Sequence, residues 1–243
     1  RRLSARMGLG AFVAAAAVVI GVVAFAPRPP EPVPTIAELR ETAAERPVPA
    51  GPLRATVLET SEGQLTATLV EIRPDGDGGG TITYSPGTPP SGLGGVRSDE
   101  PPSVWPVGPS APLVAGFTAT ELQSLPSDAD VLRRSVEDRT GPTAAPAETP
   151  KALLDLATTP FVPEPVRRAA LQAVSSLADS PGGSVRDPLD REGIALLGGS
   201  TAGRWLVVLD PDTGWPLAFA DAIAGPNPPR QTTDVAAWTV WSY

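Results

Sequence analysis

The sequence predicts an α+β domain in which a curved antiparallel sheet of about six or seven strands packs on three or four helices. A single N-terminal transmembrane helix precedes that domain. Three observations carry this expectation. Residues 7–26 form an unbroken run of apolar and small residues. Short runs rich in Thr, Val, Leu and Ile lie near both ends of the remaining chain, and helical patterns occupy its middle. Strands and helices that cluster in this way are typical of α+β domains.

The apolar run, residues 7–26, spans about 30 Å as a helix, which matches the hydrocarbon core of a bilayer. Arg1, Arg2 and Arg6 are the only charged residues before it. By the positive-inside rule, residues 1–6 are a cytoplasmic stub and the chain beyond residue 26 lies outside. We therefore expect a single-pass protein of the cell membrane with an extracytoplasmic C-terminal domain.

Two other interpretations of this run are weaker. A cleavable signal peptide would use Ala24-Phe25-Ala26 as its small-x-small site, but Pro27 follows and is poorly accepted after a scissile bond. A buried helix of a soluble domain is disfavoured by three glycines within the run. A retained anchor is favoured over both.

Composition excludes several classes of function. All 27 acidic residues follow the apolar run, and this acidic excess argues against nucleic acid and anionic headgroups as partners. The chain has no histidine and no cysteine, which removes serine–histidine, cysteine–histidine and zinc sites. A serine–lysine dyad would need Lys151, but Glu148 stands where the motif has serine. We assign no catalytic, cofactor-binding or metal-ligating residue and expect no enzyme, no cofactor and no metal.

Three local patterns have a functional and a structural interpretation. Asp212-Thr213-Gly214 matches the short aspartic-protease signature, but Pro211 precedes it, which favours a turn. The segment from Asp75 to Ile82 partly matches a calcium loop, but glycine and proline replace two ligands, which again favours a turn. Four tryptophans could line a ligand groove, but we expect them in the core. They are Trp205, Trp215, Trp238 and Trp241.

The first half of the chain is predicted to contain a tether, a helix, a hairpin and a loop. Residues 27–34 hold five prolines and predict a polyproline spacer, after which the extracytoplasmic domain covers 35–243. Thr35 and Glu38 form a capping box for a helix over 35–45. Residues 53–60 and 64–73 predict a hairpin. Residues 74–112 are rich in Gly, Pro and Ser and predict a flexible loop, with one strand at 81–84.

The second half predicts three helices and four strands. Ser127 is expected to cap a helix over 127–138 with Val131, Leu132 and Val136 inward, and Gly141 to close it. A second helix follows Thr149, and a third begins at Pro165 with Ser175 on its outer side. The strands are predicted at 193–197, 204–209, 215–220 and 235–241.

A turn between the second and third of these strands sets their register. It pairs Asp210 with Trp215 and places Leu206 and Val208 beside Leu217 and Phe219. Both faces of the sheet are then apolar. We expect helices to cover one face, and more chain, a ligand or a partner to cover the other.

Three segments resemble a known family. They are residues 125–132 (LPSDADVL), 163–177 (PEPVRRAALQAVSSL) and 209–214 (LDPDTG). Together with the apolar run they resemble a family of actinobacterial single-span membrane proteins that are often encoded beside extracytoplasmic-function sigma factors. The resemblance implies a cytoplasmic segment before Arg1 and a partner in a sigma-factor regulatory system. It carries over no catalytic residue.

We expect a non-enzymatic sensory or protein-interaction module that is anchored in the membrane and linked to sigma-factor regulation. The alternative is a surface-tethered carrier or binder of an apolar, lipid-like ligand, which the two-sided apolar sheet motivates.

Overall fold

In a computed structural model, the described residues are 34–45, 53–61, 64–75, 79–89, 101–200, 203–221 and 237–242. All of them belong to one compact unit, Pro34–Tyr243. The predicted cytoplasmic stub and transmembrane helix, and all of the tether except Pro34, lie outside the described residues. None of the helices among the described residues is long and apolar enough to cross a bilayer.

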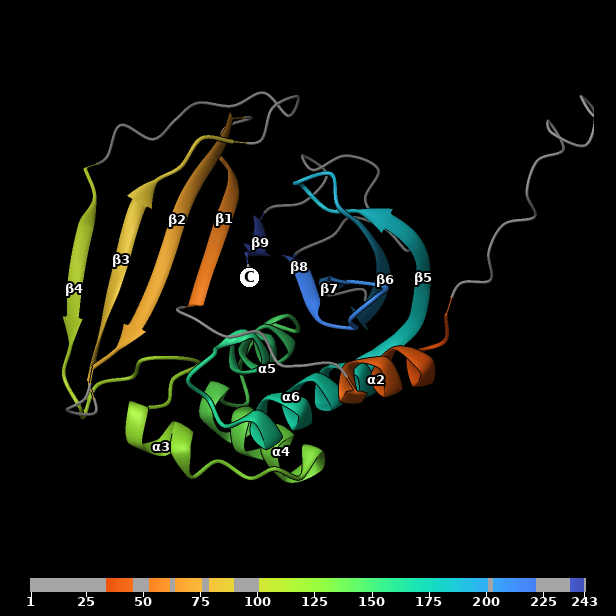
Figure 1. Cartoon of the computed structure of the whole chain (residues 1–243), viewed down its shortest axis with the longest axis horizontal. Coiled ribbons are helices and arrows are strands. Elements are labelled where there is room, and N and C mark those ends of the chain that lie inside the picture. Colours follow the sequence, from red (N-terminus) through yellow and green to blue (C-terminus); the bar gives the residue numbers. More distant parts are fainter. Residues whose placement is uncertain are drawn as a thin grey trace, which may run out of the picture. The chain divides into compact units, whose positions relative to one another are not determined.

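The strands form one antiparallel sheet of nine strands in the order β4-β3-β2-β1-β9-β8-β7-β6-β5 (Figure 1). In chain order they are β1 (Leu53–Ser61), β2 (Gln64–Pro74), β3 (Gly80–Pro86), β4 (Ser103–Val107), β5 (Ala178–Arg186), β6 (Glu192–Ser200), β7 (Gly203–Leu209), β8 (Pro216–Asp221) and β9 (Ala237–Trp241). The predicted antiparallel sheet is confirmed, and it is larger than the six or seven strands expected.

The two additional strands are its two edges, β4 and β5. β4 lies inside the stretch 74–112, in which only one strand was expected, because Pro106 and the glycines around it read as loop. β5 contains Pro181-Gly182-Gly183, and its pairing with β6 shifts register at two points. Such bulges bend a strand, and Figure 1 shows β5 and β6 strongly curved. The predicted curvature of the sheet is therefore present.

Five helices occur in the described residues. They are α2 (Ile36–Glu45), α3 (Ala119–Gln123), α4 (Ala129–Thr140), α5 (Glu148–Thr158) and α6 (Glu164–Leu177). The predicted capping box of α2 is confirmed, since the Glu38 amide donates to Thr35 Oγ1 and the Thr35 amide donates to Glu38 Oε2. α3, which was not predicted, is capped in the same way by Thr118 and Glu121.

The start of α4 corrects two expectations. Asp128, not Ser127, is the N-cap, and its carboxylate accepts the amides of Asp130 and Val131 at 3.1 and 3.0 Å. Val131, which was expected to face inward, is 41% exposed. Leu132 is buried as predicted. Gly141 ends the helix with φ of 89° and its amide donates to Glu137.

α6 is buried on more sides than its apolar stripe indicates. It contacts α2, α4, α5 and the sheet. Ser175 was expected to face outward, but it is buried and donates to the Leu171 carbonyl. Arg167 is also buried, where it donates to the Ala157 carbonyl at 2.8 Å and lies over the Trp215 ring. The least buried stripe of α6 runs through Arg168, Gln172 and Ser176, and Ser175 lies one position to the side of it.

At β6 to β9 both faces of the sheet are apolar and buried, and the prediction of two apolar faces is confirmed there. The face toward the helices contributes Trp205, Val207, Phe219 and Trp241 to the main hydrophobic cluster, together with Leu153 and other residues of α4, α5 and α6. The opposite face forms a second cluster that includes Leu58, Leu206, Val208, Trp238 and Val240. The prediction that the four strand tryptophans belong to the core is confirmed.

The turn between β7 and β8 is confirmed, but its register prediction is wrong. The Asp210 amide donates to the Trp215 carbonyl, and Gly214 adopts φ of 70°. Asp210 caps the turn, because its carboxylate accepts the amides of Asp212 and Thr213. A bulge at the next position then pairs Val208 with Ala218 and Leu206 with Ala220. Spacing alone predicts the turn but not a bulge beside it.

Candidate functional site

Two surfaces of the described residues are candidate binding sites, because each has apolar side chains at or near the solvent. The first, here called the aromatic patch, consists of Ile82, Tyr84 and Trp105 on β3 and β4. Ile82 pairs directly with Trp105, and Tyr84 follows two residues along the same face of β3. Ile82 contacts the main hydrophobic cluster, so the patch belongs to the face of the sheet toward the helices.

The aromatic patch is open to solvent. Trp105 is 61% exposed and Tyr84 is 39% exposed. Its position in the fold explains this, because β4 is the edge of the sheet and the upper parts of β3 and β4 extend beyond the helices (Figure 1). Exposed aromatic side chains that continue from a core are typical of surfaces that bind another molecule.

The edge strand itself is poorly suited to adding a further strand. β4 has five residues, and Pro106 within it has no N–H to donate. Short edge strands that contain proline are a common protection against edge-to-edge pairing. The aromatic patch is therefore suited to binding through side chains rather than through backbone ladder bonds.

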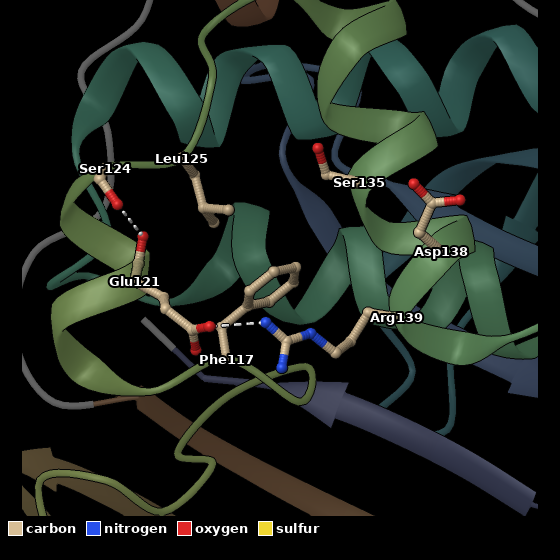
Figure 2. Close-up of a pocket in the computed structure, with 7 residues that line it drawn as sticks. All are labelled: Phe117, Glu121, Ser124, Leu125, Ser135, Asp138 and Arg139. Atoms are coloured by element: carbon tan, nitrogen blue, oxygen red, sulfur yellow. Dashed lines mark hydrogen bonds and ion pairs between the residues drawn. The ribbon is translucent and has the colours of Figure 1, made fainter.

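The second surface is an open pocket of about 450 Å³, here called the α3–α4 pocket (Figure 2). Its lining residues come from the hairpin before α3, from α3 and its end, and from the second half of α4. They are Phe117, Glu121, Ser124, Leu125, Ser135, Asp138 and Arg139. Phe117 and Leu125 point toward the middle of the pocket, between the polar residues of the two helices (Figure 2).

An ion pair with an aromatic neighbour joins the two helices at this pocket. Arg139 Nη2 lies 2.7 Å from Glu121 Oε1, and the guanidinium carbon lies 4.7 Å from the centre of the Phe117 ring. The Thr118 amide donates to the other carboxylate oxygen of Glu121 at 2.8 Å. This amide first, and then Arg139 and the Thr118 hydroxyl, hold the pKa of Glu121 below its usual range. Glu121 is therefore ionised at neutral pH and fixes Arg139 in place.

Among the described residues, neither sequence motif with a catalytic or metal-binding interpretation forms such a site. Asp212 lies in the exposed β7–β8 turn, as the structural interpretation predicted. Asp75 accepts the Gly79 amide and closes a local turn, while residues 76–78 lie outside the described residues. Within the described ranges, His, Cys, Asp and Glu form no group of three that could hold a metal ion.

Sequence reasoning missed both surfaces. It singled out the four buried tryptophans and not Trp105, whose exposure depends on β4 being an edge. A short apolar run at 103–107 was the available signal. For the pocket, the Thr118-x-x-Glu121 capping box would have predicted α3, but the approach of Glu121 to Arg139 depends on tertiary structure.

Comparisons with known proteins are sparse. No protein-family profile and no curated protein matches this chain. One similar solved structure is the complex of MucA and MucB of Pseudomonas aeruginosa, with 13% identity, 84% of this chain and 52% of the other covered, and a TM-score of 0.31. Another is MucB in complex with MucA(peri), with 13% identity, 85% and 53% covered, and a TM-score of 0.32. This chain spans about half the length of each. At such TM-scores, the likeness supports no conclusion about fold or function.

Proposed function

We propose that this chain is a non-enzymatic protein-interaction module, anchored in the membrane with its domain outside the cytoplasm, that couples an outer event to a regulatory partner. The observation that carries the proposal is the aromatic patch. Trp105 and Tyr84 are large side chains that leave much of their surface in water. A docked partner that covers them would gain about 25 cal/mol for each Å² of apolar surface buried.

The sequence supports the remaining parts of the proposal. The apolar run at 7–26, with arginines before it, favours a fixed orientation across a membrane. The absence of histidine and cysteine removes the commonest catalytic groups. The resemblance to membrane proteins encoded beside sigma factors suggests that the partner belongs to a sigma-factor regulatory system.

Crosslinking and co-purification from native membranes test the proposal. The full chain should recover a sigma factor or one of its regulators, and the double substitution Tyr84→Ala and Trp105→Ala should deplete it at least fivefold. Leu189→Ala is the matched control, because Leu189 is 39% exposed but lies on the β5–β6 loop. Recovery of no regulator, or equal recovery with all variants, would contradict the proposal.

The alternative function is a carrier or binder of an apolar ligand. The two apolar faces of the sheet motivated it in the sequence, but in the structure their side chains, such as Val207 and Val208, are buried within the chain itself. Organic extraction of the full chain purified from native membranes, followed by mass spectrometry, tests this function. A stoichiometric lipid-like molecule that is lost with the Tyr84→Ala and Trp105→Ala substitutions would support it. An extract without any enriched molecule would argue against it.

A further inference from the structure

We propose that the α3–α4 pocket binds a lysine or arginine side chain carried by an exposed segment of a partner protein. This inference adds a second contact site to the proposed function and names the chemistry of its occupant. It rests on the proposed function only in that the occupant belongs to a partner. The pocket and the aromatic patch lie on different elements, so each can fail separately.

The polar lining of the pocket offers mainly hydrogen-bond acceptors. The hydroxyl of Ser124 donates to the Glu121 carbonyl and that of Ser135 donates to the Val131 carbonyl, both at 3.0 Å. With their protons used in this way, both hydroxyls have only lone pairs left to offer. Arg139 is the one cation of the lining, and Glu121 already neutralises it. A ligand rich in N–H donors therefore fits this lining.

Asp138 supplies the charge that such a ligand requires. Its side chain is exposed at the pocket and makes no ion pair or hydrogen bond among the described residues. It lies in the last turn of α4, where the helix dipole disfavours a negative charge. A carboxylate in this place does not help the helix, and it is available to pair with a cation from outside.

The apolar part of the pocket matches the stem of a long basic side chain. Leu125 is half-buried and provides the surface on which the methylene groups can pack while the charged end stays at the rim, whereas Phe117 is only 4% exposed and lies under the Arg139 guanidinium. The whole chain carries a net charge of −8, which attracts basic segments and repels acidic ones. Shape, acceptor lining and charge therefore favour the same occupant.

Peptide titration of the full chain in detergent micelles, followed by amide NMR, tests the inference. The probes are acetyl-Gly-Leu-Arg-Gly-amide and its neutral counterpart acetyl-Gly-Leu-Gln-Gly-amide. The basic probe should shift the amides of Leu125, Ser135 and Asp138, and Asp138→Asn should weaken its binding about tenfold. Higher salt should also weaken it, because the contact is exposed.

Matched variants separate this site from general electrostatics and from the aromatic patch. Asp130→Asn removes the same charge from the same helix outside the pocket and should leave binding within twofold. Trp105→Ala should also leave it unchanged. Equal binding of the two probes, equal binding to Asp138→Asn, or shifts confined to other surfaces would overturn the inference.

Discussion

Gly198 and Trp205 face each other across β6 and β7, and the indole ring of Trp205 fills the space that a side chain at position 198 would need. A Cβ atom at 198 would overlap three ring carbons of Trp205. The ring is buried in the main hydrophobic cluster, where it is 2% exposed. This glycine is therefore required by packing rather than by its backbone conformation.

Gly198→Ala should consequently lower the free energy of unfolding by about 1–3 kcal/mol, the usual range for overpacking a core. Chemical denaturation of the full chain in mild detergent measures it. Gly108→Ala is the control, because no atom lies within 4 Å of a Cβ built there, and its effect should stay within about 0.5 kcal/mol. Equal effects at both glycines would show that Trp205 does not limit position 198.

The N-cap of α4 distinguishes the structure from the sequence prediction. Asp128→Ala removes the acceptor of two amides and should cost about 1 kcal/mol, whereas Ser127→Ala should be nearly neutral. Asp128→Asn should retain most of the stability, because an amide oxygen can accept the same bonds. Thermal unfolding measures the stability of all three variants. A larger loss of stability for Ser127→Ala than for Asp128→Ala would support Ser127 as the N-cap.

The loop between β5 and β6 is fixed by an ion pair with one buried partner. Arg191 lies 2.6 Å from Asp187, whose side chain is fully buried, and it also donates to the carbonyls of Leu217 and Trp241. Arg191→Met leaves a buried carboxylate without its cation and should cost about 3–5 kcal/mol in denaturation. Arg186→Met, which breaks exposed pairs with Asp190 and Glu192, should change stability by less than about 1 kcal/mol. Similar losses of stability for Arg191→Met and Arg186→Met would show that the buried ion pair of Asp187 does not fix this loop.

Glu121 should contribute a pH-dependent part of the stability. Since folding lowers its pKa, its contribution is complete above the usual range of a glutamate and is lost as the pH falls through the folded-state pKa. Glu121→Gln should therefore be less stable than the wild-type chain at about pH 7, and the difference should shrink toward about pH 3. Thermal midpoints across this range measure it. A difference that does not change with pH would show that the capping box and Arg139 do not stabilise the ionised form of Glu121.

Local signals in the sequence were sufficient for much of the fold. The capping box of Thr35 and Glu38 and the turn that ends at Gly214 each depend on residues within a few positions. The helix predicted after Thr149 is present as α5, which begins one residue before Thr149, and its leucines such as Leu153 are buried at helical spacing.

The errors occur where distant segments decide the outcome. β4 contains a proline, β5 contains a proline and two glycines, and both become strands because β3 and β6 pair with them. The bulge in β8 lies between the pairs Leu209–Pro216 and Val208–Ala218, and the spacing of the turn residues does not predict it. Glu121 and Arg139 are 18 residues apart, and only the packing of α3 beside α4 brings them into contact. Neither candidate surface could be predicted from the sequence without knowledge of these contacts.

A photo-crosslinking amino acid at position 105, compared with position 189, tests the central claim most directly. Incorporated into the full chain in its native membrane, it should give one predominant adduct from position 105, identified by mass spectrometry as a regulator of a sigma factor, and none from position 189. Tyr84→Ala in the same chain should reduce the yield of this adduct. If position 105 gives no adduct, or the same adducts as position 189, the aromatic patch does not dock a partner.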